Sequence, residues 1–190
     1  MIAALFVDPR GPYANDPRFD IWDEERDART YAGPHPVIAH PPCARWCRLA
    51  PVNAARWGAK IGQDGGTFKA ALEAVRTYGG VLEHPAYSIA WDRYQLPVPK
   101  RGVWRRTLWD EGFVTEVSQS AYGHVARKRT WLYVIGDPLP MDWSDPPGQV
   151  VVGAGVNTGQ AAGKGRPSAL EAIATPPAFM EALVALAEHP

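Results

Sequence analysis

A cysteine that directly follows two prolines is the residue of this chain best suited to chemistry. Residues 37–43 read Val-Ile-Ala-His-Pro-Pro-Cys, a short apolar run closed by two helix- and strand-breaking residues. The run predicts a buried strand, and because proline donates no ladder hydrogen bond the strand must stop there. Cys43 is therefore expected beyond the carboxyl end of a strand, where open α/β sheets bind ligands. A thiolate at that place is a nucleophile; the alternative is a small buried hydrophobic residue.

Two further motifs occupy the ends of other expected strands. Glu83-His84-Pro85 closes a run at Val81–Glu83, and Arg127-Lys128-Arg129 leads into a run at Thr130–Ile135. A carboxylate, an imidazole that titrates near neutrality and a basic cluster are groups that bind and protonate polar substrates. Each also has an ordinary interpretation, as a salt-bridged carboxylate, a hydrogen-bonded turn residue and a solvated loop.

Taken in order, these motifs resemble those of the cytosine-5 DNA methyltransferases. That family has a Pro-Pro-Cys motif after one strand, a Glu-Asn-Val or Glu-Asn-Pro motif after the next, and a Gln-x-Arg-x-Arg motif before a later one. Cys43, Glu83 and the pair Arg127/Arg129 fall on those positions. The closing Thr-Pro-Pro-Ala-Phe segment also resembles the end of small phage-type DNA methylases. The resemblance covers roughly residues 35–136 and 172–188.

The resemblance implies a role for each matched residue. Cys43 would add to carbon 6 of a pyrimidine flipped out of the duplex, which turns carbon 5 into a nucleophile. Glu83 would hydrogen-bond or protonate the ring edge, and Arg129, together with Arg127, would supply electrostatic support. The remaining residues expected to line the base pocket are His40, Pro42, Trp46, His84 and Pro85.

The chain also departs from the family pattern. His84 stands in place of the asparagine, and Val125 in place of the glutamine. The Phe-x-Gly-x-Gly loop for S-adenosylmethionine is not found, and residues 137–170 are too few to form a target-recognition domain. The turn at Val7-Asp8-Pro9 is more similar to the end of the family's second strand, whose acid holds a cofactor ribose. Asp8 is therefore the expected cofactor residue, and S-adenosylmethionine stays open as the cofactor.

Composition and charge are those of an ordinary globular protein. Of 190 residues, 46% are hydrophobic and 21% charged, and no apolar run is long enough to span a membrane, so we expect a cytoplasmic protein. Two cysteines, without a second Cys/His pair, predict neither a disulfide framework nor a metal site. The formal net charge is +0, but three basic groups would form a phosphate-binding surface if they converged. They are Arg45/Arg48/Arg56/Lys60, Lys100/Arg101/Arg105/Arg106 and Arg127/Lys128/Arg129.

The pattern of elements predicts a single α/β domain over residues 1–190, with a mostly parallel sheet flanked by helices. It is a trimmed Rossmann-like methyltransferase fold. Expected strands cover 2–7, 37–39, 81–83, 113–117 and 130–135, with a short one at 150–152. Expected helices cover 68–78, capped by Thr67, and a C-terminal segment capped by Thr175. A short helix is expected at 23–29, and an ordered loop or broken helix at 44–66.

Two classes of function fit these observations. The first is a DNA-modifying enzyme that acts at carbon 5 of a pyrimidine through Cys43. The second is a non-catalytic DNA-binding or inhibitory relative that keeps the base pocket and lacks the cofactor half. A further alternative is a subunit whose cofactor site is completed by a partner or by its own dimer.

Overall fold

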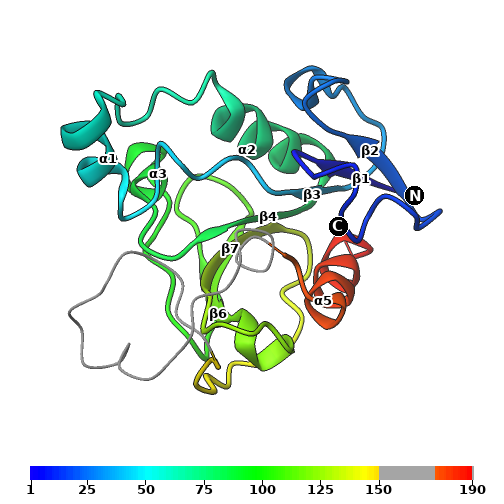
Figure 1. Cartoon of the computed structure of the whole chain (residues 1–190). Helices are drawn as coiled ribbons and strands as arrows, with labels where there is room; N and C mark the ends of the chain where they lie inside the picture. Colours follow the sequence, from blue (N-terminus) through cyan, green and yellow to red (C-terminus); the bar gives the residue numbers. More distant parts are fainter. Residues whose placement is uncertain (150–173, 190) are drawn as a thin grey trace.

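A seven-stranded sheet with the order β2-β1-β3-β4-β7-β6-β5 forms the centre of the computed structural model, which describes residues 1–149 and 174–189 (Figure 1). The chain is a single α/β domain. The strands are β1 (Ile2–Leu5), β2 (Phe19–Trp22), β3 (Val37–Ala39), β4 (Gly80–Pro85), β5 (Arg105–Arg106), β6 (Phe113–Ser118) and β7 (Arg129–Ile135).

The sheet is mixed, so the expectation of a mostly parallel sheet is wrong. β2, β1, β3 and β4 pair in parallel, whereas β7, β6 and β5 continue the sheet by antiparallel pairing. The physical reason lies in the connections. Residues 119–128, between β6 and β7, hold only a 3-10 helix, and a parallel neighbour requires a longer crossover.

The parallel half changes direction between β1 and β3. From β1 the chain moves outward to β2 and then returns to the other side of β1 to form β3 and β4. Such a switch point leaves a crevice outside the carboxyl ends of the strands, where α/β proteins bind their ligands. The segments after β1 and β3 therefore border the expected place for a site.

One long helix covers each face of the sheet (Figure 1). On one face, α2 (Thr67–Tyr78) contributes Phe68 and Val75 to a core that includes Leu82 of β4. On the other face, α5 (Pro177–Ala187) packs Leu183 against Val81 and its neighbours. The shorter helices are η1 (Ala28–Thr30), α1 (Ala50–Trp57), α3 (Ile89–Arg93) and η2 (Gln119–Tyr122).

The central strands confirm their predictions, and the differences lie at strand ends and sheet edges. β3 has the predicted bounds, whereas β1 ends at Leu5 because Phe6 adopts a left-handed conformation with φ 59°. β4 includes Pro85, which its partner Thr130 faces in the last register pair. The helix expected at 23–29 is wrong, since β2 ends just before it and only η1 forms there. The strand expected at 150–152 lies outside the described residues.

Both predicted helix caps are wrong. α2 begins after Gly66, whose φ is 84°, and Asp64 rather than Thr67 accepts the first backbone N–H groups. α5 begins after Pro176, without a side-chain cap, and Thr175 instead lies beside the Tyr13 hydroxyl. The predicted stop of α2 is confirmed, because the Gly79 N–H bonds the Val75 carbonyl. None of the helices in the described part of the chain has the length and apolar character that a membrane crossing needs.

Candidate functional site

The strand ends that carry the three motifs meet at one edge of the sheet. The parallel strands β1, β3 and β4 end there, and so does β6, while antiparallel β7 begins there. The motifs expected from the sequence follow or precede these ends. The fold thus brings the segments of Cys43, Glu83 and Lys128 to the same edge.

Glu83 is buried near this edge and is held from two sides. Its Oε2 atom lies 3.1 Å from Nδ1 of His40, and Gln119 Nε2 donates to Oε1 at 2.9 Å. Gln119 is fixed in turn by a second bond, 2.9 Å, to the Thr130 hydroxyl. Burial alone would raise the pKa of Glu83, but the His40 hydrogen bond and the positive charge of Lys128 hold it at about 2. The carboxylate is therefore ionised, and each oxygen keeps a lone pair for a ligand.

His40 connects this carboxylate to a buried tyrosine. The Tyr13 hydroxyl lies 2.8 Å from Nε2 of His40, and burial raises the pKa of Tyr13, so that Tyr13 keeps its proton. An ionised Glu83 only accepts, so His40 donates from Nδ1 and accepts the Tyr13 proton at Nε2. The three side chains form one directed chain of hydrogen bonds, Tyr13 to His40 to Glu83. The His40 side chain, in the middle of this chain of hydrogen bonds, is 14% exposed and reaches solvent.

Cys43 follows Pro42 at the end of β3 and is half-buried. Burial raises the pKa of the thiol, and the negative charge of Glu83 raises it further, whereas Lys128 lowers it. Thiol, carboxylate and ammonium are thus close enough to influence one another. At neutral pH the resting thiol is protonated, and it becomes a nucleophile when a proton acceptor or added positive charge reaches it.

The two arginines expected at the site belong to a different cluster. Side chains alternate along a strand, so Arg129 lies on the same face of the sheet as Trp131, the face that α2 covers. Glu83 pairs with Leu132 and lies on the opposite face, which α5 covers. Arg129 Nε donates to Glu116 at 2.9 Å, and Arg127 Nε donates to Asp145 at 2.7 Å. The expected support of Glu83 by Arg129 and Arg127 is therefore wrong, and Lys128, which lies between them in the sequence, is the cation that acts on Glu83.

His84 and Trp46 are core residues, which corrects their expected role as ligands of a base. His84 is fully buried, with its ring 5.2 Å from Phe68 and 6.2 Å from Trp91. The Pro42 carbonyl lies near the His84 ring, but neither ring nitrogen makes a well-formed hydrogen bond within the described residues. Burial lowers the pKa of His84 to about 4, so the ring is neutral. Trp46 is also buried, and its Nε1 donates to Asp64 at 2.8 Å.

The two prolines differ in position. Pro42 is exposed directly beside Cys43, where a ligand of the thiol would meet it. Pro85 is the final residue of β4 and is only partly exposed in the sheet. Pro42 therefore keeps its expected place at the site, and Pro85 mainly ends the strand.

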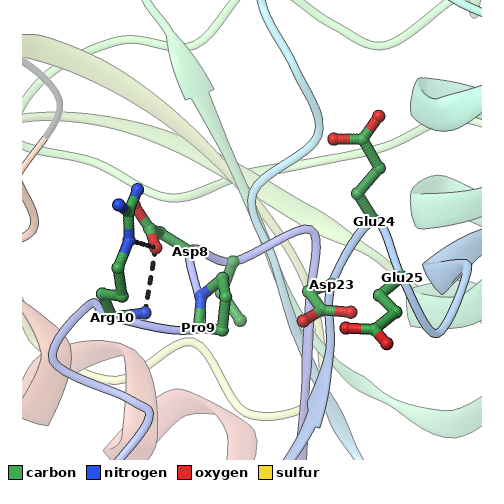
Figure 2. Close-up of a pocket in the computed structure, with 7 residues that line it drawn as sticks. Asp8, Pro9, Arg10, Asp23, Glu24 and Glu25 are labelled. Carbon is green, nitrogen blue, oxygen red and sulfur yellow. Dashed lines mark hydrogen bonds and ion pairs between the residues drawn. The ribbon is translucent and has the colours of Figure 1, made fainter.

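A pocket opens beside the site, at the carboxyl ends of β1 and β2 (Figure 2). Its volume is about 570 Å³, and the segments 7–10 and 23–25 line it from opposite sides. Asp8 accepts hydrogen bonds from the side chain and backbone of Arg10, while Asp23, Glu24 and Glu25 lie across the pocket. The size is that of a small-molecule site.

The strand order corrects the assignment of Asp8. β1 lies beside β3 in the middle of the parallel half, so the outer position expected for it belongs to β2. The acids that follow this outer strand are Asp23, Glu24 and Glu25. Their carboxylates are hydrogen-bond acceptors and suit a ligand that carries hydroxyl groups or a positive charge. Asp8 lines the same pocket, but its carboxylate is already paired with Arg10.

Sequence reasoning missed Tyr13 and Gln119, and it placed Lys128 in a basic group without linking it to Glu83. Tyr13 lies in a Pro-rich loop, and Gln119 lies in the connection after β6, so neither belongs to a motif. The sequence indicated only their position: Gln119 directly follows β6, and Lys128 directly precedes β7, at the same edge of the sheet. Comparisons with protein-family models, with curated proteins and with solved structures found no match for this chain.

Proposed function

We propose that this protein modifies DNA at carbon 5 of a pyrimidine, by covalent activation of the base through Cys43. The observation that carries the proposal is the convergence of Cys43, Glu83 and Lys128 from β3, β4 and the start of β7 at one edge of the sheet. A nucleophile, a fixed carboxylate and a cation are the groups that this chemistry requires.

The first half of the reaction forms a covalent adduct. The Cys43 thiol gives its proton to solvent, and the thiolate adds to carbon 6 of the ring. The displaced electron pair moves so that the ring edge takes up a proton from solvent at nitrogen 3. Carbon 5 is then part of an enamine. Glu83 faces the ring edge with its free lone pairs, while His40 and Gln119 keep its orientation constant. The Tyr13–His40 chain supplies a route by which the buried carboxylate exchanges a proton with solvent.

The second half transfers a group and restores the ring. Carbon 5 bonds to an electrophile, whose leaving group departs, and the proton on nitrogen 3 returns to solvent. The hydrogen already on carbon 5 then leaves as a proton to solvent, and the carbon–sulfur bond breaks to release the Cys43 thiolate. S-adenosylmethionine held by Asp23, Glu24 and Glu25 would supply a methyl group as the electrophile. With water as the only proton source, the same steps exchange the hydrogen on carbon 5 for a solvent hydrogen.

Hydrogen exchange tests the proposal without knowledge of the electrophile. The protein is incubated in deuterium oxide with duplex or single-stranded DNA, and the mass of its pyrimidine nucleosides is measured. We expect deuterium at carbon 5 of one pyrimidine with the wild-type chain and none with Cys43→Ser. Cys47→Ser is the matched control, because it removes a thiol four residues away, and it should retain most of the exchange.

A second experiment names the transferred group. Nucleosides from DNA of cells that express the wild-type chain are compared by mass spectrometry with those from cells that express Cys43→Ser. An added mass that depends on Cys43 identifies the modification. If neither experiment finds a change that depends on Cys43, on ordinary DNA or on DNA with modified pyrimidines, the catalytic proposal is rejected.

The resting state of the site favours one other function. Burial raises the pKa of Cys43, and both Glu83 oxygens already accept hydrogen bonds from protein groups. These features suit a non-catalytic relative of the cytosine-5 DNA methyltransferases that binds DNA or inhibits another enzyme through this edge of the sheet. A further alternative is a subunit whose cofactor site is completed by a partner or by a second copy of the chain. Such a protein would bind DNA equally well as wild type and as Cys43→Ala, with no deuterium exchange in either.

A further inference from the structure

Tyr87 is an exposed aromatic residue in a strained backbone conformation close to the candidate site. It follows Glu83 by four residues, at the end of β4, and its φ is 66°. A bulky side chain seldom adopts this left-handed conformation, and such strain is concentrated at functional positions. The residue is 45% exposed, although its ring contacts Trp131 at 5.6 Å between ring centroids. The fold thus holds an aromatic ring outward at an energetic cost.

Two guanidinium groups flank this ring. Arg129 lies 4.9 Å from the ring centroid and also donates to the Tyr87 hydroxyl, and Arg48 lies 5.8 Å from the centroid. Arg48 follows Cys43 by five residues, and Arg129 begins β7. The Arg–Tyr–Arg group is therefore built from the segments that also carry Cys43, Glu83 and Lys128.

The charged side chains around Tyr87 carry an excess of positive charge. Arg101 and Arg127 both pair with Asp145, and Arg101 and Arg129 both pair with Glu116. Arg48 is exposed and forms no ion pair with any residue among 1–149 and 174–189. Four arginines thus face two carboxylates, which leaves two positive charges. The four arginines come from all three basic groups of the sequence, two of them from the third, so those groups converge in part.

We propose that Tyr87 and Arg48 form a docking surface for a DNA strand beside the Cys43 site, with an unpaired base stacked on Tyr87 and a phosphate on Arg48. Proteins that hold single strands combine aromatic stacking platforms with basic side chains in this way. Tyr87 follows the end of β4, at the edge of the sheet that also carries Cys43 and Glu83, so a strand docked there borders the site. This assignment rests on the proposed function for the identity of the strand, but its binding test is independent of catalysis.

The test measures binding of a fluorescein-labelled single-stranded DNA 20-mer by anisotropy. Tyr87→Leu removes the stacking ring and should weaken binding about 5- to 100-fold, whereas Tyr87→Trp retains a ring and should bind like the wild type. Arg48→Gln should weaken binding and make its dependence on the logarithm of salt concentration shallower by roughly 0.7. The matched control is Arg26→Gln, which removes an arginine stacked on Trp22 at 3.8 Å, at the β2 end of the sheet.

The outcomes separate the docking surface from the reaction. Unchanged binding in Tyr87→Leu, or an equal loss in the folded Arg26→Gln protein, would overturn the docking surface even if wild-type protein exchanges deuterium into DNA. A loss confined to Tyr87→Leu and Arg48→Gln supports the surface even if no exchange is found. Circular dichroism of each variant confirms that the fold is retained, and if Tyr87→Leu fails to fold, Arg48→Gln with its salt dependence decides the question.

Discussion

Glu83 is the residue at which burial and polar contacts oppose each other most directly. Burial favours the neutral acid, and His40, Gln119 and Lys128 favour the carboxylate, with a net pKa of about 2. Because the folded pKa is below the ordinary 4.5, the unfolded chain takes up the proton first as pH falls. Glu83 therefore stabilises the fold above about pH 4.5, and this contribution is lost between about pH 4.5 and 2.

We predict that Glu83→Gln removes this pH-dependent stabilisation. The variant should be less stable than the wild type at pH 7 by on the order of 3 kcal/mol, and the difference should shrink as pH falls below about 4.5. Urea unfolding at a series of pH values measures both quantities. A difference that stays constant from pH 7 to pH 3 would show that the charge of Glu83 contributes nothing to stability.

His84 should also make the fold sensitive to acid, in a higher pH range. Its pKa is lowered from 6.5 to about 4 by burial, so the unfolded chain binds a proton that the folded chain does not. Stability should therefore fall as pH decreases from about 6.5 to 4. We predict that His84→Phe, which keeps a ring against Phe68 and Trp91, flattens this part of the profile and is more stable than the wild type at pH 5. Thermal unfolding at pH 7 and pH 5 tests this, and an equal pH slope in the variant would contradict it.

At the scale of elements, the Asp64 side chain links α2 to the segment after Cys43 through hydrogen bonds. Asp64 accepts the backbone N–H of Phe68 at 2.8 Å and the indole N–H of Trp46 at 2.8 Å. Trp46 in turn belongs to the turn that begins at Cys43, whose carbonyl accepts the Trp46 backbone N–H at 2.9 Å. The start of α2 and the orientation of the Cys43 turn therefore depend on the same carboxylate.

We predict that Asp64→Ala lowers the free energy of unfolding by about 2–3 kcal/mol, since it removes a helix cap and leaves a buried indole N–H without its partner. Asp64→Asn retains one acceptor oxygen and should lose roughly half as much. Deuterium exchange into DNA should fall in Asp64→Ala at temperatures where the variant is still folded. Full activity and stability in Asp64→Ala would show that Trp46 and α2 are held by other contacts.

The elements that sequence reasoning identified are those with strong local signals. β3, α2 and β7 are buried, β-branched or periodic, and they are bounded by glycine or proline. β2 and β5 were missed because they are short edge strands of four and two residues, whose formation depends on their neighbours. The α2 cap was missed because Asp64 lies three residues before the helix, with two glycines between that adopt left-handed conformations.

At the scale of the whole molecule, stability should decrease from the centre of the sheet toward its edges. β3, β4 and β7 are paired on both sides and covered by α2 and α5, while β2 and β5 have one neighbour each. We predict the slowest amide hydrogen exchange for β4 and β7 and the fastest for β2 and β5 among the strands. Exchange measured by mass spectrometry or NMR tests this order. Protection of β2 equal to that of β4 would indicate that something covers the β2 edge in solution.

The sequence could predict which segments meet at the site but not which side chains face each other. Cys43 and Glu83 follow from strand ends, because parallel strands end at a common edge. Lys128 precedes β7 and reaches this edge because β7 is antiparallel, which the expected mostly parallel sheet did not include. The separation of Arg129 from Glu83 follows from the alternation of side chains along β7, where a shift of one residue changes the face. That register is set by pairing with β4 and β6, which no local pattern in the sequence specifies.

The boundary between the parallel and antiparallel halves of the sheet has a consequence for how the site forms during folding. β6 and β7 are close in sequence and can pair early, whereas β4 must cross a long distance along the chain to reach β7. Cys43, His40 and Glu83 belong to the first half, and Gln119 and Lys128 belong to the second. Gln119 and Lys128 therefore reach Glu83 only when β4 docks on β7, whereas His40 belongs to the same half as Glu83. In a nascent or partly folded chain the contacts from Gln119 and Lys128 are absent, so the Cys43 thiol comes under the charge of Lys128 only in the completed fold.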